Sequence, residues 1–567
     1  MTSGGGLKSL PGMMRRLAAL PGITFALVLA WKVALLLFTA QPVPSNDAFF
    51  YDGPVVNYLL HGKYCNPSLA LVLPISGNDF FCAYPPLYQA ALLGWMSVLG
   101  TSALAAMWLH VLLFGVYAVT ALAILRRLQA PAVGINIAGL LLFSITFHDR
   151  PDSLAHVLGM AAVYVWVRGA YPRCAAVCSL SCAEGGEGRG EKAHFLPEQI
   201  PSSRLSPRSG VERESGPVSG CAWLTAALLV LTFCTSLQIG GTYFLWLALL
   251  AVGGAGWRQI QFPWAAAVGL AGTLAVLISL VKFGFPHFWA GFQEHAQMTS
   301  TLTGWRLPQV ADLIKVVRTI PGILIVGAAL VWRAARGNFS REWLAKSPPA
   351  RLAVTGTVVG FALITGSLLL LSANSIMIAN YLQPVVVGCL LAAWSAEPCS
   401  RKTRNILFAS FALAALLVSV RAIGMTTWGL ACARDVSYAQ ALARVRAELD
   451  AVPDGCKVLV TSAYLYETAQ RTNVTWIHAD WPSVWSPDQG EMKALLKVRP
   501  AKLILTQFDY HRRQRVILDQ LSERRELAAL RVTDTARVPV PDASPALQKV
   551  VQHISWAPVI VELSWHE

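Results

Sequence analysis

Two aspartates near the start of the sequence, just after its first apolar stretch, have carboxylates that could act as a general base. Asp47 follows the first long apolar stretch and precedes the aromatic run 49–51, and Asp52 comes just over one helical turn later. Aromatic rings are favoured at the headgroup level of a bilayer, so we expect this run to lie there. A carboxylate at that level could take a proton from a hydroxyl. A solvated loop acid or a helix cap explains Asp47 about equally well.

A second group of charged residues comes about a hundred positions later. Asp152 directly follows Pro151, and because proline is favoured at the first helical position, Asp152 should lie near a helix amino terminus. The helix dipole stabilises an acid there by a few tenths to about 1 kcal/mol and keeps it charged, which suits a helix end or a reactive site. Cations available to a phosphate on the same side, each also readable as a surface charge, are Arg150, Lys282, Arg306 and Lys315.

The composition sets the class of protein. Of 567 residues, 55% are hydrophobic and 14% are charged, and several apolar runs are long enough to cross a bilayer. This combination predicts a mostly α-helical, polytopic membrane protein. The net charge of +15 does not indicate nucleic-acid binding, because lysine and arginine gather in short clusters at the ends of the apolar runs, where they set membrane orientation.

The hydrophobic pattern predicts about eleven spans, the first at 17–40 and the last at 406–426. With a basic, cytoplasmic amino terminus and an odd number of spans, the basic clusters fall on one side. Asp47, Asp149 and the loop from Lys282 to Arg318 fall on the other. The expected divisions are a cytoplasmic 1–17, a membrane module at 18–428 with a first outer loop and interfacial helices at 41–100, a disordered cytoplasmic loop at 171–220, and an outer domain at 429–567.

Beyond residue 428 the sequence changes character. Short β-rich runs alternate with helical stretches, which predicts a small α/β domain. The predicted strands are 458–462, 475–479, 503–507 and 559–563, and the predicted helices are 441–449, 490–497 and 512–527. No G-x-G-x-x-G motif follows a strand, so no nucleotide site is expected. An accessory role, an acceptor-facing role and a structural lid remain open.

The cysteines and histidines give weak signals. Cys65 and Cys82 share the first outer loop, in a compartment that permits disulfides, so a bridge is as well supported as two free thiols. Three cysteines spaced four apart lack a standard zinc pattern, and reversible acylation or no role fits them better. They are Cys174, Cys178 and Cys182. His287 and His295 lie eight apart, too far for a metal motif.

Four short motifs give the chain a family resemblance. It resembles the type C fold glycosyltransferases, in the branch that includes the protein O-mannosyltransferases and the lipid A aminoarabinose transferases. In that family the first outer loop carries D-E-x-x-Y, and here Ala48 stands in the place of the second acid. Tyr84 replaces the lysine that is common before the family's Pro-Pro-Leu motif. Asn380 replaces the arginine that is frequent before its Tyr-Leu-x-Pro motif. The motifs are Asp47-Ala48-Phe49-Phe50-Tyr51, Pro85-Pro86-Leu87, Arg150-Pro151-Asp152 and Tyr381-Leu382-Gln383-Pro384.

The resemblance implies an enzyme that moves a hexose or pentose from a polyprenyl-phosphate carrier to a lipid, glycan or protein acceptor, with inversion. Because the lipid phosphate is already a good leaving group, the site needs mainly a base and positive charge. The implied catalytic residues are Asp47 as general base, with Asp152 as the second candidate. No cofactor is required, and a divalent cation remains open. The implied substrate contacts are Tyr51, Asp52, Tyr84, Arg150, Lys282 and Tyr381.

The expected location is the bacterial inner membrane, with the site facing the periplasm. Two other functions remain open. A transporter or flippase of lipid-linked sugars should carry ionisable residues in mid-span, where the sequence has almost none. A non-catalytic scaffold is kept open by Ala48, which removes the second acid of the first motif.

Overall fold

A computed structural model describes most of the chain, and all structural statements concern its described residues. These are 20–44, 46–70, 73–81, 84–145, 147, 150–170, 216–252, 269–272, 274, 290–291, 293–294, 308–369, 373–397, 401–433, 436–479, 490–534 and 545–566. Lys282, Arg306, Asp149, His287 and His295 lie outside them, as do Cys82 and the cysteines at 174, 178 and 182. So does 171–215, most of the expected cytoplasmic loop.

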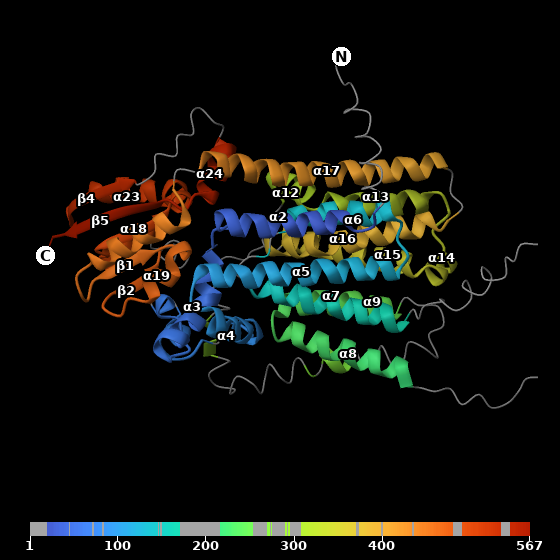
Figure 1. Ribbon diagram of the computed structural model, residues 1–567, viewed down its shortest axis with the longest axis horizontal. Coiled ribbons are helices and arrows are strands. Elements are labelled where there is room, and N and C mark those ends of the chain that lie inside the picture. Colours follow the sequence, from blue (N-terminus) through green and yellow to red (C-terminus); the bar gives the residue numbers. More distant parts are fainter. Residues whose placement is uncertain are drawn as a thin grey trace, which may run out of the picture.

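A bundle of apolar helices makes up most of the molecule (Figure 1). Each arises from an apolar run with few charges. Inside a bilayer, such a single segment can form all its backbone hydrogen bonds within itself only as a helix. Its members, with their bounds, are α2 (Ile23–Thr39), α5 (Ala103–Arg127), α6 (Ala132–Leu141), α7 (Pro151–Ala170), α8 (Gly216–Phe233), α9 (Leu237–Val252), α13 (Pro321–Ala335), α15 (Pro348–Leu369), α16 (Ala373–Ser395) and α17 (Arg401–Cys432). These are the helices of an integral membrane protein.

In the part of the chain that the structure describes, fewer helices than the predicted eleven spans are long and apolar enough to cross a membrane. Among the described residues, 5 helices are long and apolar enough to cross a membrane, and a sixth is added if the bent pair α12 (Val310–Thr319) and α13 counts as one span. Five further apolar helices are shorter, at 10–17 residues. The prediction of about eleven spans is therefore not confirmed. The predicted outer loop 282–318 contains α12, a helix that the sequence pattern did not indicate.

Helix α16 forms the centre of the bundle. In the most apolar stretch of α16, 94% of the residues are buried inside the protein, whereas the corresponding share for α17 is 17%. Helix α17 therefore lies at the periphery of the bundle. Close packing between α7 and α9 depends on a glycine. A side chain at Gly159 of α7 would overlap the ring of Tyr243 on α9, so a larger residue there would force these two helices apart.

The first outer segment folds against one end of the bundle. It contains α3 (Asn46–His61), a 3₁₀ turn (Pro67–Leu69), a π-helical turn (Ile75–Asp79) and α4 (Leu87–Leu99). The aromatic run was expected at headgroup level, but Phe49, Phe50 and Tyr51 are at most 8% exposed. Phe49 packs edge-on against Trp476 and His478. Protein surface therefore covers these rings, and their depth at the headgroup level stays a prediction.

The described residues between 438 and 566 form a carboxyl-terminal domain at the same end of the molecule as α3 and α4 (Figure 1). Its sheet has the strand order β2-β1-β3-β5-β4. Strands β2, β1 and β3 are parallel to one another. Strand β5 is antiparallel to its two neighbours, β3 and β4. The strands are β1 (Lys457–Val460), β2 (Thr475–His478), β3 (Lys502–Thr506), β4 (Leu527–Asp534) and β5 (Pro558–Trp565). This confirms the predicted α/β class.

The described helices of this domain are α18 (Tyr438–Asp450), α19 (Leu465–Ala469), α21 (Gly490–Val498), α22 (Gln507–Asp509), α23 (Arg515–Ser522) and α24 (Pro545–Ile554). Two of the three predicted helices, 441–449 and 490–497, match α18 and α21, whereas 512–527 is shortened and α19, α22 and α24 were not predicted. The predicted helix 512–527 ends early, because Leu527 starts the unpredicted strand β4. The sequence LAALRVTD of β4 has little β-branched character, and its strand form depends on pairing with β5.

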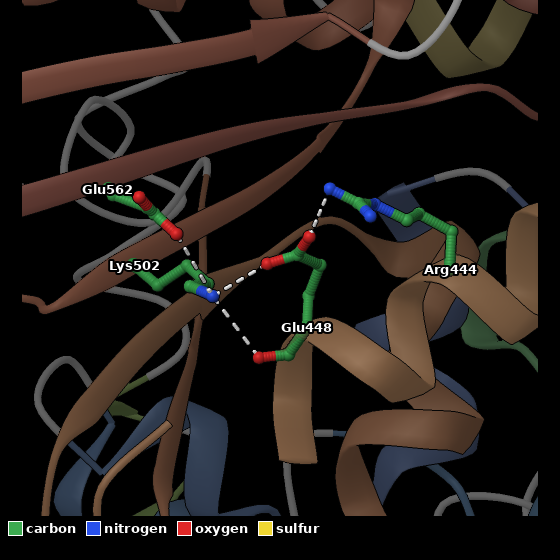
Figure 2. Close-up of polar contacts among 4 residues, drawn as sticks. All are labelled: Arg444, Glu448, Lys502 and Glu562. Carbon is green, nitrogen blue, oxygen red and sulfur yellow. Dashed lines mark hydrogen bonds and ion pairs between the residues drawn. The ribbon is translucent and has the colours of Figure 1, made fainter. Parts of the chain in front are cut away.

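A buried lysine ties the sheet to helix α18. Nζ of Lys502 donates to Oε2 of Glu448 at 2.7 Å and to its backbone oxygen at 3.2 Å (Figure 2). Arg444 pairs with the other carboxylate oxygen of Glu448 at 2.5 Å. Oε1 of Glu562, on β5, lies 3.5 Å from the same Nζ. Because a buried ammonium is costly without partners, this network holds the helix on the sheet.

Candidate active site

The beginnings of α3 and α7 lie together at the end of the bundle that faces the carboxyl-terminal domain. Asp47 is in the first turn of α3, and Asp152 is in the first turn of α7, just after Pro151. A carboxylate in the first turn of a helix is favoured by the exposed backbone N–H groups. Both acids thus occupy positions that their local sequence selects, and the tertiary fold brings them together.

Arg150 joins the two acids. Its Nη1 lies 3.2 Å from Oδ2 of Asp47, and its Nε lies 3.2 Å from Oδ2 of Asp152. The side chain of Asp47 is 42% exposed, whereas those of Arg150 and Asp152 are 22% and 23% exposed. Asp47 is therefore the acid most open to an incoming molecule. We call these three residues the Arg150 cluster.

The electrostatics of the Arg150 cluster keep its cation charged. Burial opposes the charge, but Asp47, Tyr51 and Asp152 together raise the pKa of the Arg150 guanidinium above its ordinary value. With one cation between two acids, the cluster carries a net charge of about −1 when both acids are ionised. A phosphate would have to compete with these carboxylates for Arg150.

Two tyrosines of the predicted site lie beside this cluster. The rings of Tyr51 and Tyr84 meet edge to face with centroids 4.8 Å apart, and their hydroxyls are hydrogen-bonded. Burial, together with the neighbouring Tyr84, raises the pKa of Tyr51 well above its usual value, and burial also raises the pKa of Tyr84. Both hydroxyls therefore stay protonated at neutral pH, and because one donates to the other, a single O–H of the pair is left as a donor.

A serine that the sequence gave no reason to select contacts the second acid. Ser236, in the turn between α8 and α9, hydrogen-bonds to the carboxylate of Asp152. Asp152 thus has a cation on one side and a hydroxyl donor on the other. Such fixed partners suit a residue that positions the cluster.

Two other predicted contacts, Asp52 and Tyr381, are also buried. Asp52 is 0% exposed and accepts hydrogen bonds from the hydroxyls of Tyr88, at 3.0 Å, and Tyr466, at 2.8 Å. Tyr381 is 6% exposed and stacks on His156 with centroids 3.9 Å apart. In this state neither side chain is open to a ligand, and their roles toward substrate stay predictions.

A chain of hydrogen bonds runs from Asp52 back toward the Arg150 cluster. Nε2 of His110 lies 3.2 Å from the Tyr88 hydroxyl, and its Nδ1 lies 3.3 Å from Oγ of Ser153. Since Tyr88 donates its proton to Asp52, Nε2 must donate to Tyr88, and Nδ1 then accepts from Ser153. Ser153 directly follows Asp152, so these hydrogen bonds connect Asp52 of α3 to the first turn of α7.

A large cavity opens beside the cluster. Its volume is about 1110 Å³, and it lies between α2, α5, α12, α17 and the carboxyl-terminal domain. Asp47 and His110 are among its lining residues, whereas Arg150 and Asp152 are not. Much of its wall is apolar, including Trp31, Leu35, Phe114, Phe143, Leu417 and Val418. Asp47 therefore faces the cavity from the edge of the cluster.

Metal ligands do not gather in the part of the chain that the structure describes, where no group of three or more histidine, cysteine, aspartate or glutamate side chains could hold an ion. The divalent cation left open by the sequence remains untested. Cys65 is buried beside Asn57, whose amide nitrogen lies 3.4 Å from its sulfur. Cys82, the partner in the bridge that the sequence left open, lies outside the described residues.

The sequence matches no family model and no curated protein. Among solved structures, the fold is similar to apo ArnT from Cupriavidus metallidurans, with 12% identity, 98% of each chain covered and a TM-score of 0.47. The same protein bound to undecaprenyl phosphate gives a TM-score of 0.45 at 12% identity, with 98% of each chain covered. The archaeal oligosaccharyltransferase AglB from Archaeoglobus fulgidus, in complex with an inhibitory peptide and a dolichol-phosphate, gives 0.46 at 9% identity, over 94% of this chain and 77% of that one.

Both are type C fold glycosyltransferases, the group that the sequence motifs resemble. The identities and scores are low, so the likeness concerns the arrangement of the chain and assigns no substrate. The chemistry proposed below therefore rests on the described side chains.

Proposed function

We propose that this chain is a membrane glycosyltransferase that moves a sugar from a polyprenyl-phosphate carrier to an acceptor hydroxyl, with inversion. The observation that supports it most is the Arg150 cluster, in which a half-exposed acid, a partly buried cation and a second acid meet beside a large cavity at the end of a membrane bundle. These are the groups that such a transfer needs, since the carrier phosphate leaves without help from a general acid.

In the proposed reaction Asp47 is the general base. It takes the proton of the acceptor hydroxyl while the acceptor oxygen forms a bond to the anomeric carbon of the sugar. The bond between that carbon and the phosphate oxygen breaks, and its electron pair leaves with the carrier phosphate. Inversion in this proposal requires the acceptor, activated by Asp47, to attack the face of the anomeric carbon opposite the carrier phosphate.

Arg150 neutralises the departing phosphate in this proposal. Its raised pKa keeps it charged throughout the reaction. Its guanidinium group can release Asp47 and bind a phosphate oxygen while it keeps its contact with Asp152. Asp152, held by Ser236, positions Arg150 for this exchange. The hydrogen-bonded pair of Tyr51 and Tyr84 has one hydroxyl donor left for the same phosphate or for the sugar.

The site is proposed to face the outside of the cell, in the periplasm of a bacterium. Its support is the distribution of basic clusters along the sequence, which fall at the other end of the bundle, for example at Arg126 and Arg127 at the end of α5. The sugar and the identity of the acceptor are left to experiment.

One observation favours a second candidate function, transport of a lipid-linked sugar. Lys32 lies in the middle of α2, lines the cavity and sits 5.7 Å from the centre of the Phe114 ring. An ionisable residue in mid-span is typical of transporters. In a transporter, Lys32→Met would abolish movement of the lipid-linked sugar and Asp47→Asn would not.

The test of the transferase is Asp47→Asn, which keeps size and removes the charge. In a deletion strain complemented with each variant, mass spectrometry of lipid-linked sugars and envelope glycans follows transfer, normalised to protein level. We expect transfer to fall by about a hundred- to ten-thousand-fold. Asp79→Asn, an exposed acid in the same outer segment, is the matched control. Retained transfer in Asp47→Asn together with its loss in Asp152→Asn would move the base to Asp152.

A further inference from the structure

Two arginines face the same cavity as Asp47 from helices far apart in the sequence. Arg318 is in the last turn of α12, and Arg421 is in α17. In the described part of the chain, neither has a carboxylate oxygen within 4.0 Å. The helix dipole accounts for a cation at the end of α12, but not for a second one that α17 contributes to the same cavity wall.

The acids on the cavity wall are occupied elsewhere. Asp47 is paired with Arg150. Asp509, from the carboxyl-terminal domain, accepts a hydrogen bond from Oγ1 of Thr506 at 2.6 Å. With Lys32, Arg318 and Arg421 against Asp47 and Asp509, the described cavity wall has more cations than acids. Two guanidinium groups with a shared space between them fit an anion, and phosphate in particular, because each can donate two parallel hydrogen bonds.

Both arginines lie at the level of the outer membrane surface. Helix α17 has 32 residues and is therefore about 48 Å long. Counted from its basic start at 401–404, Arg421 is about 30 Å along, the thickness of the hydrocarbon core. Helix α12 is bent by 91° from α13 and exposes Val310, Leu313 and Val317, as an interfacial helix does. Arg318 at its end is thus at headgroup depth.

We propose that Arg318 and Arg421 bind the phosphate headgroup of a lipid-anchored acceptor. This inference rests on the proposed function, because a general base must touch the acceptor and Asp47 is the member of the Arg150 cluster that lines this cavity. The apolar wall from α2, α5 and α17 provides the surface for an alkyl chain, and the volume of about 1110 Å³ accommodates a lipid headgroup with part of its chains. The acceptor class is a phosphate-bearing amphiphile whose hydroxyl reaches Asp47.

The test measures lipid binding and needs no transfer activity. Native mass spectrometry of the full-length protein gives apparent affinities for three probes: phosphatidic acid, the uncharged diacylglycerol with the same chains, and undecaprenyl phosphate. We expect phosphatidic acid to bind at least about tenfold more tightly than diacylglycerol, the equivalent of one charge-assisted contact. The Arg318→Gln/Arg421→Gln variant should lose this preference and keep its affinity for undecaprenyl phosphate.

Matched controls separate charge from folding. Arg524→Gln/Arg525→Gln removes the same charge from exposed positions of the carboxyl-terminal domain and should keep the preference. Arg318→Lys/Arg421→Lys should restore most of it. The proposal is overturned if the glutamine variant keeps its preference for phosphatidic acid, or if it loses undecaprenyl phosphate binding instead, since the cavity would then belong to the carrier. Loss of transfer in Asp47→Asn is a separate readout, so failure of the proposed function would be recognised independently.

Discussion

The hydroxyl of Tyr466 donates a 2.8 Å hydrogen bond to Oδ2 of Asp52, and this contact joins the carboxyl-terminal domain to helix α3. Asp52 lies five residues after Asp47 on the same helix. His61, at the other end of α3, lies 3.0 Å from the backbone oxygen of Ala469. The domain thus holds the helix that carries the proposed base at two points.

Tyr466→Phe should loosen this attachment. It leaves the fully buried carboxylate of Asp52 with one donor fewer, which costs about 1–3 kcal/mol, and the melting temperature should fall. Transfer should also fall, although Asp47 is unchanged, because α3 is less firmly placed. Tyr58→Phe, at a position that is 45% exposed, is the control. Equal melting temperatures for the two variants would contradict a role for Tyr466 in holding α3.

Arg150→Ala should leave Asp47 and Asp152 without their shared cation. Removal of one preorganised donor to a developing negative charge costs on the order of a hundredfold or more in rate, so transfer from the carrier should fall at least that far. Arg150→Lys keeps the charge but cannot bridge both acids, and it should recover only part of the activity. The comparison is Arg336→Ala, an exposed cation beyond the end of α13. Similar activity of Arg150→Ala and Arg336→Ala would refute the assignment.

Glu467 should make stability depend on pH. Burial raises its pKa from 4.5 to about 7, while Arg446, with Nη2 3.6 Å from Oε1, opposes the shift. The folded protein therefore keeps a proton on Glu467 that the unfolded chain has released, and this contribution to stability is lost as the pH rises from about 5 to 8. Glu467→Gln should have little effect at pH 5 and should raise the melting temperature relative to the native protein at pH 8.

The control for this pH dependence is Glu523→Gln, at an exposed position of the same domain. Its melting temperature relative to the native protein should be the same at both pH values. A Glu467→Gln variant with an equally flat difference would show that Glu467 does not titrate in this range.

Lys502→Met tests the network that holds α18 on the sheet (Figure 2). It leaves the buried carboxylate of Glu448 with Arg444 as its remaining ion-pair partner among the residues drawn. Breaking a buried pair costs roughly 3–5 kcal/mol, and we expect the lower end because Arg444 stays. Glu562→Gln removes a partner that is 44% exposed and should cost about 0–1 kcal/mol. Urea unfolding of both variants gives the comparison, and equal losses would exclude a special role for Lys502.

The direction of the chain in the membrane can be tested with two tags. A tag inserted between residues 171 and 215 should be cytoplasmic, and a tag after Glu567 should be outside, because basic clusters mark the inner side. Protease protection in intact cells and in inverted vesicles distinguishes the two sides. Both tags on one side would remove the basis for an external site.

The sequence alone determined the local features of this protein. Apolar runs of the required length specify membrane helices, since the backbone has few other ways to satisfy its hydrogen bonds in lipid. Runs such as Lys457–Val460 and Lys502–Thr506 became strands close to where the pattern placed them. Proline at position 151 put Asp152 in a first helical turn. Each of these outcomes depends on residues within a few positions of one another.

The tertiary structure decided which of these local features meet. Asp47 and Arg150 are about a hundred residues apart in sequence, and Asp52 and Tyr466 are 414 apart; no periodicity records such pairs. Burial of the aromatic run at 49–51 and the strand form of β4 likewise depend on surfaces supplied by distant segments. Side-chain type and spacing report local conformation, whereas long-range contacts arise from packing of whole helices and sheets. Hence the sequence selected the charged residues, and the fold alone brought Asp47, Arg150 and Asp152 into one cluster.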